Sequence, residues 1–380
     1  MRNNKYVVFV VNPGSTSTKI ALFENDQKIF QENVNHDIKE LQACRTIHDQ
    51  LPKRMATILN AISDHHLDLS GIDAFAARAG GLVGLSGGVY RITENNTLYE
   101  TTLNSNRHPN VLGPQIVIEL AKIYGGECFT VNPPDVDELC DYERVTGFKE
   151  LFRESRGHPL NHKENCIRYA QSINKHYEDL NLICVHLGGG VTVGAHCKGK
   201  LICCNDCLSG DGPMAPTRSG WVPPSEIVKM CFSNAYTQEE ILNRISKCGG
   251  FTDHLGTADV QEIVKRIEAG DEYAALIYNA FIYQVAKQIG ACSVVLEGHV
   301  DAIILTGGIA KDDYLKKQIR KYIEWIAPII DQAGEYEMEG LASGAIRVLS
   351  KAEPVKEYTG IPIFNGFKCK GAPILKDYKG

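Results

Sequence analysis

The sequence predicts an α/β fold made of two similar domains, each a sheet covered by helices. Strand-like and helix-like stretches alternate along the chain, as they do in sheets that carry helices on their faces. An order of strand, glycine turn, strand and polar return occurs at 10–29 and again at 184–202, which indicates a duplicated domain. The length of 380 residues also exceeds what one ordinary core accommodates.

The expected strands are short apolar runs rich in β-branched residues. Glycine or polar residues bound each run, as is usual for strands. They occupy residues 6–11, 72–77, 182–186, 191–197 and 302–305.

The expected helices have apolar residues at helical spacing and recognisable ends. Residues 110–126 end on a glycine pair, and residues 161–177 begin with Asn161, a favourable N-cap. Residues 257–291 are expected to form two consecutive helices that meet near Gly270. A further helix begins at 312 and is stopped by Pro328.

Charge and hydropathy argue against two classes of partner. The formal net charge is −6 without a basic block, so no nucleic acid partner is expected. No apolar run approaches the roughly 20 residues of a membrane-spanning helix, so no membrane association is expected. The apolar run at 6–11 is shorter than the roughly 7–15 residues of a secretory signal core, which favours a cytoplasmic protein.

Thirteen cysteines are scattered along the chain, many of them inside apolar runs. Buried free thiols in a reducing compartment explain this distribution better than disulfides do. Cys203, Cys204 and Cys207 form one cluster that could hold zinc. A structural zinc site needs four ligands, and no second pair with matching spacing is present.

The first expected strand runs into a turn that could bind an anion. In NPGSTSTK, at 12–19, Asn12 and Gly14 are followed by the hydroxyls of Ser15 and Ser17 and by Lys19. Backbone N–H groups, hydroxyls and a lysine together make a plausible phosphate nest. The alternative is an ordinary hairpin turn that uses these residues for their conformational preferences.

Two further glycine turns follow apolar strands. Three consecutive glycines weaken a strand connection, and close approach of a ligand to the backbone is one reason to retain them. The turns are HLGGG, with His186, Gly188, Gly189 and Gly190, and TGGIA, with Gly307, Gly308, Ile309 and Ala310. Ligands of open α/β sheets bind at such strand ends, although the second turn can also be a simple strand-to-helix connection.

Two arginines could supply the complementary charge. Arg78 follows an expected strand in AARAGGL, and Arg218 lies in a loop rich in glycine and proline. A guanidinium fork matches the oxygens of phosphate and carboxylate. Either arginine could instead form a surface ion pair.

The motifs VNPGSTSTK, RAGG, HLGGG, TRSG and LTGGIA occur in this order along nearly the whole chain. In this respect the sequence resembles the acetate and butyrate kinase family. HLGGG, the HLGT at 254–257 and the EYTG near the end are closer to the butyrate branch.

The resemblance implies the ribonuclease H-like fold of actin-like ATPases, in which two duplicated domains enclose a nucleotide cleft. The expected domains are 1–155 with about 336–380, and a nucleotide-binding domain at 156–335. The helix at 337–352 is expected to return to the first domain. A homodimer or larger homo-oligomer is also implied.

The resemblance further implies reversible transfer of the ATP γ-phosphoryl group to a short-chain fatty acid, with Mg²⁺ as cofactor. Arg78 and Arg218 match the family's two active-site arginines, and His162 aligns with a histidine placed on the transferring phosphoryl group. His108 matches a further histidine. Glu337 matches a carboxylate near the magnesium, although the nearby Glu339 makes the register ambiguous.

The same resemblance distributes the nucleotide contacts among the glycine turns. Asn12 lies near the phosphates, residues 186–190 line their path, and residues 307–310 flank the adenosine.

One position departs from the family pattern. Asn132 stands where the family usually has an aspartate, so a charge that attracts a divalent ion is absent. Asp135 or Asp137 could compensate. The departure leaves open a second hypothesis, a non-catalytic or weakly active nucleotide-binding protein, and another short acid such as acetate, propionate or isobutyrate remains an alternative substrate. No function is assigned to the tail at 361–380.

Overall fold

The computed structural model describes residues 5–106 and 108–367. These residues form two compact units. Unit 1 comprises the chain up to Asp137 together with Tyr336–Asn365, and unit 2 comprises Glu138–Glu335 with the following Gly366 and Phe367. The sequence-based domain limits of 1–155 with about 336–380, and 156–335, stay predictions.

Unit 1 is built on a seven-stranded sheet in the order β12-β5-β6-β4-β1-β2-β3. Its strands are β1 (Val7–Pro13), β2 (Ser17–Glu24), β3 (Gln27–Asn35), β4 (Ala74–Ala77), β5 (Val89–Ile92), β6 (Glu127–Val131) and β12 (Val355–Lys356). Its helices are α1 (Ile38–Gln42), η1 (His48–Gln50), α2 (Leu51–Asp64), α3 (Thr97–Leu103), η2 (Pro109–Leu112), α4 (Gly113–Tyr124) and α13 (Glu337–Leu349).

Unit 2 contains a five-stranded sheet in the order β11-β10-β7-β8-β9. Its strands are β7 (Asn181–Leu187), β8 (Val191–Cys197), β9 (Lys200–Cys204), β10 (Ala302–Gly307) and β11 (Ile329–Ala333). Its helices are α5 (Asp141–Arg144), α6 (Pro159–Ser172), η3 (Tyr177–Asp179), α7 (Pro224–Cys231), α8 (Gln238–Ser246), α9 (Phe251–Leu255), α10 (Val260–Glu268), α11 (Glu272–Val295), η4 (Ile309–Lys311) and α12 (Asp313–Ile323).

Five strands of the unit 1 sheet, in the order β6-β4-β1-β2-β3, have the topology of the unit 2 sheet, which confirms the predicted duplication. In each, a strand is followed by two antiparallel neighbours, β1-β2-β3 in unit 1 and β7-β8-β9 in unit 2. The central strand then pairs in parallel with a later one, β1 with β4 and β7 with β10. The second strand of each set even carries a bulge at the equivalent place, at Leu22/Phe23 and at Ala195/His196.

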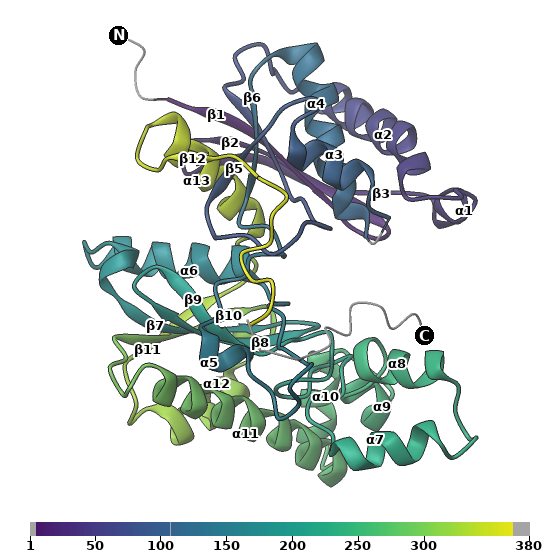
Figure 1. Ribbon diagram of the computed structural model, residues 1–380, viewed down its shortest axis with the longest axis vertical. Helices are drawn as coiled ribbons and strands as arrows, with labels where there is room; N and C mark the ends of the chain where they lie inside the picture. Colours follow the sequence, from purple (N-terminus) through teal and green to yellow (C-terminus); the bar gives the residue numbers. More distant parts are fainter. Residues whose placement is uncertain (1–4, 107, 368–380) are drawn as a thin grey trace. The chain divides into compact units, whose positions relative to one another are not determined.

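Helices cover both faces of the unit 2 sheet because its central strands are apolar on both sides. Leu182 and Cys184 of β7 pack with α6, whereas Ile183 and Val185 face the core that contains α11 and α12. Figure 1 shows α6 on one side of this sheet and α11 and α12 on the other.

In unit 1 the sheet is covered in the same way. Helix α4 packs against β1, β4 and β6, and α13 also packs against these three strands. Because α13 begins at Glu337, the chain returns to unit 1 after completing unit 2.

Several element ends differ from their predictions. Asn161 is not the N-cap of its helix, because α6 already begins at Pro159 and the N-cap position is His158. Asn161 is instead a buried residue of the first turn. Helix α12 ends at Ile323, before Pro328 is reached. Helices α10 and α11 flank Gly270 as predicted.

Within the described ranges, no helix is long and apolar enough to cross a membrane. Of the predicted tail at 361–380, residues 368–380 lie outside the described part of the chain.

Candidate active site

The turn between β1 and β2 occupies residues 14–16 and is a hairpin. Asn12 lies opposite Lys19 in the antiparallel register, and the Gly14 N–H donates to the Ser17 carbonyl at 2.8 Å. Ser15 is exposed at the tip of this turn and Ser17 is half-buried. The hairpin interpretation of the sequence is therefore confirmed for the backbone, and the exposed hydroxyls leave the phosphate hypothesis open.

A buried arginine of α2 donates hydrogen bonds to this turn. The guanidinium of Arg54 donates to the carbonyls of Gly14 at 2.9 Å and Ser17 at 3.3 Å, and to the Thr18 hydroxyl at 3.0 Å. The Arg54 side chain has no exposed surface, and burial lowers its pKa to about 10. Because the hydrogen-bond acceptors that the structure gives Arg54 are neutral, a positive charge lies directly under the turn.

Three predicted site residues meet at one point of unit 1. Arg78, which follows β4, forms an ion pair with the Glu337 carboxylate at the start of α13. The Asn12 amide at the end of β1 donates to the other carboxylate oxygen of Glu337 at 3.0 Å. Arg78 and Glu337 keep 17% and 20% of their side-chain surface exposed, so solutes can reach the cluster.

The structure distinguishes the two neighbouring glutamates. Glu337 faces Arg78 and Asn12, whereas the Glu339 carboxylate pairs with Lys28 on β3 at 3.0 Å. Glu337 is thus the carboxylate that belongs to the cluster.

His108 and Asn132 belong to unit 1 but have structural contacts of their own. His108 is the N-cap of η2, where its Nδ1 accepts from the Asn110 N–H at 3.2 Å. Partial burial, and then the charges of Arg78 and Arg54, lower the pKa of His108. Asn132 adopts φ 39°, and its side-chain oxygen accepts from the Gly88 N–H at 2.7 Å. Asparagine is among the few residues that tolerate this backbone region.

In unit 2, the last glycine of HLGGG makes room for an arginine. A Cβ atom placed on Gly190 would lie 1.5 Å from Nη1 of Arg218. Arg218 lies next to a tight turn closed by the Ala215 N–H, which donates to the Arg218 carbonyl at 3.0 Å. The Arg218 Nε and Nη1 atoms are buried and make no hydrogen bond within the described residues.

Two buried cationic donors without an acceptor are costly unless an anion or a water molecule binds them, because burial removes their hydration. Arg218 therefore has the environment of an anion-binding residue, which the ion-pair interpretation of the sequence does not explain.

Two histidine rings stack beside this turn. The His158 and His186 ring centroids are 4.1 Å apart, with an interplanar angle of 22°. Nδ1 of His186 lies 3.1 Å from the Asn161 side-chain oxygen, and a Cβ on Gly188 would lie 2.8 Å from His186 Nε2. His158 is half-buried and occupies the N-cap position of α6, where the helix dipole favours anions.

His162, which the resemblance places on the transferring phosphoryl group, has no exposed surface in the structure. Its two ring nitrogens lie 2.8 Å from the Thr192 hydroxyl and 3.3 Å from Nε2 of His196. Burial lowers the pKa of His162 to about 3. His158, one turn earlier, is half-buried, whereas His162 is fully buried. The phosphoryl-contacting role of His162 stays a prediction.

Sequence reasoning missed His158, although the signal was present. HPLNH places His158 and His162 four residues apart, which puts both on one face of a helix. Only the structure shows which of the two lies at the exposed end.

The turn after β10 is shaped by a close backbone approach. Gly307 has φ 92°, and a Cβ there would lie 2.2 Å from the Leu187 carbonyl oxygen, so only glycine fits. Gly308 has open space around its Cβ position, while Ile309 and Ala310 are buried.

The cysteine cluster offers no metal site in the described part of the chain. Cys203, Cys204 and Cys207 are buried free thiols, and burial raises the pKa of Cys204 and Cys207. No group of three or more His, Cys, Asp and Glu side chains that could hold a metal ion occurs within residues 5–106 and 108–367.

The predicted residues thus form separate groups within the units. Unit 1 joins Asn12, Arg78 and Glu337 beside the 14–16 turn, and unit 2 joins Arg218 with the 186–190 turn.

These features define a class of protein, a duplicated α/β fold with glycine turns at the ends of its central strands. In agreement, the chain is similar to the crystal structure of Porphyromonas gingivalis acetate kinase, with a TM-score of 0.75 and 19% identity, over 90% of this chain and 100% of that chain. The similarity at this identity concerns the fold.

Sequence comparison defines the family. The acetokinase family pattern matches residues 150–335. Two Clostridium acetobutylicum proteins are similar over 93% of this chain and 99% of their own length: butyrate kinase 1, with 41% identity, and butyrate kinase 2, with 43%. The chain belongs to the acetokinase family.

Proposed function

We propose that this protein is a butyrate kinase, which transfers the γ-phosphoryl group of ATP reversibly to butanoate or a branched analogue. The observation that carries the proposal is the similarity to two butyrate kinases over nearly their whole length. The anion-binding environment of Arg218 supports it independently of the comparison.

The chemistry requires few reacting groups from the protein. A short-chain carboxylate is already ionised at neutral pH, so it attacks phosphorus without a general base. Catalysis then rests on alignment and on neutralising the oxygens of the transferring group.

We assign the roles in unit 2 from its geometry. The buried Nε and Nη1 of Arg218 would donate to phosphoryl oxygens, and the backbone at 188–190 would lie beside the phosphates. His158, with its ring at the N-terminus of α6, takes the phosphoryl-contacting role that sequence reasoning gave to His162. His186 supports the His158 ring by stacking. Gly307, Gly308, Ile309 and Ala310 are assigned to the adenosine.

In unit 1, Asn12 and residues 14–17 are assigned to phosphate and Arg78 to an anionic oxygen of the substrates. The exposed Ser15 and half-buried Ser17 hydroxyls and Lys19 complete this assignment. Gly14 contributes by closing the turn, since its N–H already donates to the Ser17 carbonyl. His108 remains a candidate for the same site, since the charge of Arg78 already acts on its ring.

Mg²⁺ is the proposed metal cofactor. It typically uses one or two carboxylates together with substrate phosphates, so a site without three protein ligands fits it. Glu337 is the carboxylate of the unit 1 cluster and would hold the ion, whose chemistry is to neutralise phosphate charge. The Asn12 amide fixes the Glu337 carboxylate for this role.

We also propose a cytoplasmic homo-oligomer that binds neither nucleic acid nor membranes. Supporting observations are the net charge of −6 and the free thiols of the described residues. Apolar side chains on α11, including Leu276 at 62% exposed and Val294 at 76%, support an oligomer.

A kinase assay with a series of C2–C5 acids tests the function. Purified protein with ATP, with and without Mg²⁺, is expected to form acyl phosphate, trapped as the hydroxamate, most rapidly from C4 acids. A preference for acetate or propionate would change the substrate assignment. Absence of acyl phosphate from every acid would reject the proposal.

Asn132 favours a second candidate, a nucleotide-binding protein with weak or no turnover. Its amide oxygen already accepts a hydrogen bond from the Gly88 N–H, and its charge is neutral where the family usually has an aspartate. Under this candidate, nucleotide binds without acyl phosphate formation, and Asn132→Asp raises turnover. Calorimetric binding of ADP combined with the acid-series assay separates the two candidates.

A further inference from the structure

A continuous chain of hydrogen-bonding groups leads from the interior of unit 2 to His158. The Tyr177 hydroxyl lies 2.6 Å from Nδ1 of His196, and Nε2 of His196 lies 3.3 Å from Nδ1 of His162. Nε2 of His162 lies 2.8 Å from the Thr192 hydroxyl, which lies 3.0 Å from Nδ1 of His158. We call Tyr177, His196, His162 and Thr192 the relay. All four are buried.

Three elements bring the relay together. Alternation along β8 places Thr192, Gly194 and His196 on the face that α6 covers. A Cβ on Gly194 would lie 2.9 Å from Nδ1 of His162, so the glycine provides the space for that ring. The bulge at Ala195/His196 locally turns the strand, as bulges next to functional sites commonly do.

Proton counting gives the relay a direction. A neutral imidazole has one N–H donor and one acceptor nitrogen. If the Tyr177 hydroxyl donates to His196 Nδ1, His196 must carry its proton on Nε2 and donate to His162. His162 then donates through Nε2 to Thr192, and the Thr192 hydroxyl donates to Nδ1 of His158. In this arrangement His158 carries its proton on Nε2.

The opposite direction leaves a donor unused. If His196 donated to the Tyr177 oxygen, the buried Tyr177 hydroxyl hydrogen would have no acceptor among its recorded partners. A buried unsatisfied donor costs about 1–3 kcal/mol. The first direction satisfies every donor of the relay.

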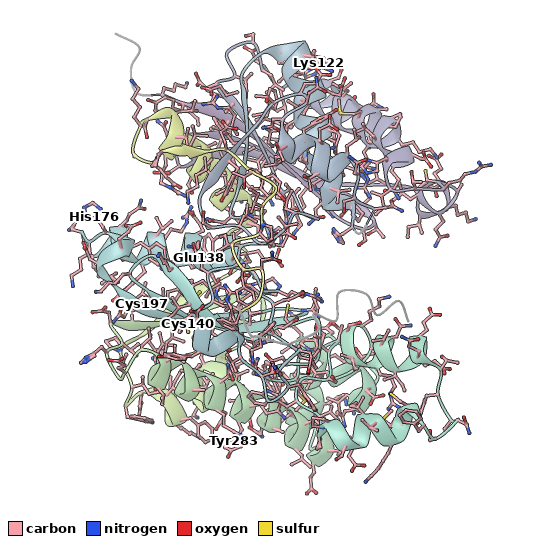
Figure 2. All side chains as sticks on the ribbon, viewed as in Figure 1. Lys122, Glu138, Cys140, His176, Cys197 and Tyr283 are labelled. Carbon is pink, nitrogen blue, oxygen red and sulfur yellow. The ribbon has the colours of Figure 1, made fainter. Side chains whose placement is uncertain are left out.

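The surroundings keep the two inner histidines neutral, as the count requires. Burial, then nearby histidine and lysine charges, lower the pKa of His196, and burial lowers the pKa of His162 to about 3. The cation involved is Lys163, which pairs with Glu138 at 2.7 Å and lies 5.7 Å from the centre of the Tyr177 ring. Figure 2 labels Glu138, which also accepts from the Leu201 N–H of β9 at 2.8 Å.

We propose that the relay is a positioning device that holds His158 in its Nε2–H tautomer. Resting on the proposed function, this assigns His158 Nε2–H as a hydrogen-bond donor to a phosphoryl oxygen. His162 and Tyr177 are then positioning residues that never contact the substrate. The geometry also explains why His162 is buried although it lies one turn from His158.

Histidine-ring ¹⁵N NMR tests the tautomer directly. Full-length protein with ¹⁵N-labelled histidine rings is expected to show His158 as the Nε2–H tautomer, with His158→Asn identifying its signals. An Nδ1–H tautomer at His158 in the unmodified protein would overturn the proposal.

Two variants test the relay itself. In Tyr177→Phe the terminal donor is absent, so His158 is expected to show a mixture of tautomers, with kcat reduced about tenfold and little change in KM for ATP. Thr192→Val removes the last link with nearly the same shape and is expected to have the same effect. Tyr169→Phe on the same helix as His158 is the matched control and should leave both measurements unchanged.

The outcomes separate the two proposals. An unchanged His158 tautomer in both Tyr177→Phe and Thr192→Val, each folded by circular dichroism, would overturn the relay. A protein that forms no acyl phosphate but shows the expected tautomer and its loss in the variants would reject the kinase function and support the relay.

Discussion

Four positions separate His158 from His162, yet the two rings have different surroundings. His158 occupies the N-cap position of α6 and remains partly exposed, while His162 fits against Gly194 and reaches no solvent. The sequence does not distinguish the two residues, since both are histidines and their spacing of four places them on one face of the helix. What distinguishes them is how closely β8 packs against each ring, and this packing is set by the tertiary structure.

Arg218 and Gly190 give the first prediction at this scale. Gly190→Ala is expected to reduce kcat/KM about a hundredfold, because the new methyl group would displace the guanidinium that it meets at 1.5 Å. Initial rates of acyl phosphate formation measure the effect.

A glycine outside the assigned site supplies the control for this prediction. Because Gly189 is itself assigned to the phosphate site, the neutral comparison is Gly147 of unit 2, whose Cβ position also has no atom within 4 Å. Gly147→Ala should retain activity within about threefold. Equal losses in Gly190→Ala and Gly147→Ala would show that displacement of Arg218 is not the cause.

At the scale of elements, the two hairpins are the repeated unit of the molecule. Their strands, turns and bulges correspond, but the means of holding each turn differ. In unit 1 a buried arginine binds the turn carbonyls, whereas in unit 2 the turn carbonyl of Gly189 accepts from the Thr217 hydroxyl at 3.1 Å. The two corresponding turns are therefore stabilised by different side-chain hydrogen bonds.

Arg54 gives a prediction for the first hairpin. Arg54→Met keeps the apolar length but removes the donors to the turn carbonyls and to the buried Thr18 hydroxyl, which should cost about 2–4 kcal/mol of stability. The loosened 14–16 turn should also raise KM for ATP more than it lowers kcat. Thermal unfolding and steady-state kinetics measure the two effects.

Lys53→Met is the control, since Lys53 is the neighbouring residue of α2 and its side chain is 41% exposed. It should change the unfolding midpoint by less than Arg54→Met does. The prediction fails if both variants have the same midpoint as the unmodified protein.

Two helical glycines are expected to respond with opposite signs. In α13, a Cβ on Gly344 would lie 2.5 Å from the Val131 side chain of β6, so Gly344→Ala should destabilise unit 1 by about 1–3 kcal/mol. In α11, the Cβ position of Gly290 is open, so Gly290→Ala should stabilise the helix by about 0.5–1 kcal/mol. Thermal unfolding of both variants checks the signs, and a stabilising Gly344→Ala would contradict the close packing of α13.

At the scale of the whole molecule, the sequence was sufficient to predict the repeated strands but not the edge strand that is paired only through tertiary contacts. The apolar runs at 191–197 and 302–305 predicted β8 and most of β10, because alternating buried strands have a strong local signal. The edge strand β12 has only two residues, Val355–Lys356, and pairs with β5 through a tertiary contact. Because of this, no local sequence pattern predicts it.

The site shows the same division. Arg78, Arg218 and Asn12 stand out in the sequence because glycine and proline surround them. Arg54 does not, because a lone arginine in an amphipathic helix is usually on the solvated face and its burial depends on the turn above it.

The buried histidines make the stability of the protein depend on pH. His162 and His196 have a folded-state pKa below the ordinary value of a histidine, His162 at about 3, because burial disfavours the charged ring. The unfolded chain therefore binds more protons than the folded chain between the ordinary histidine pKa and about pH 3. Across this window the free energy of unfolding decreases as the pH is lowered. Each such histidine costs about 1.4 kcal/mol per pH unit once the pH is below the unfolded-state pKa of about 6.5.

Urea unfolding at pH 7, 6 and 5 measures this dependence before most carboxylates titrate. His162 and His196 are expected to lower the free energy of unfolding by about 2–4 kcal/mol between pH 7 and pH 5, with proton uptake on unfolding. His36, whose pKa burial lowers to about 4, adds to this fall. His66→Asn removes an exposed histidine at a backbone φ of 51°, which asparagine tolerates, and should leave the slope unchanged. A free energy that is the same at pH 7 and pH 5 would mean that His162 and His196 accept protons in the folded state, which the donor count of the relay forbids.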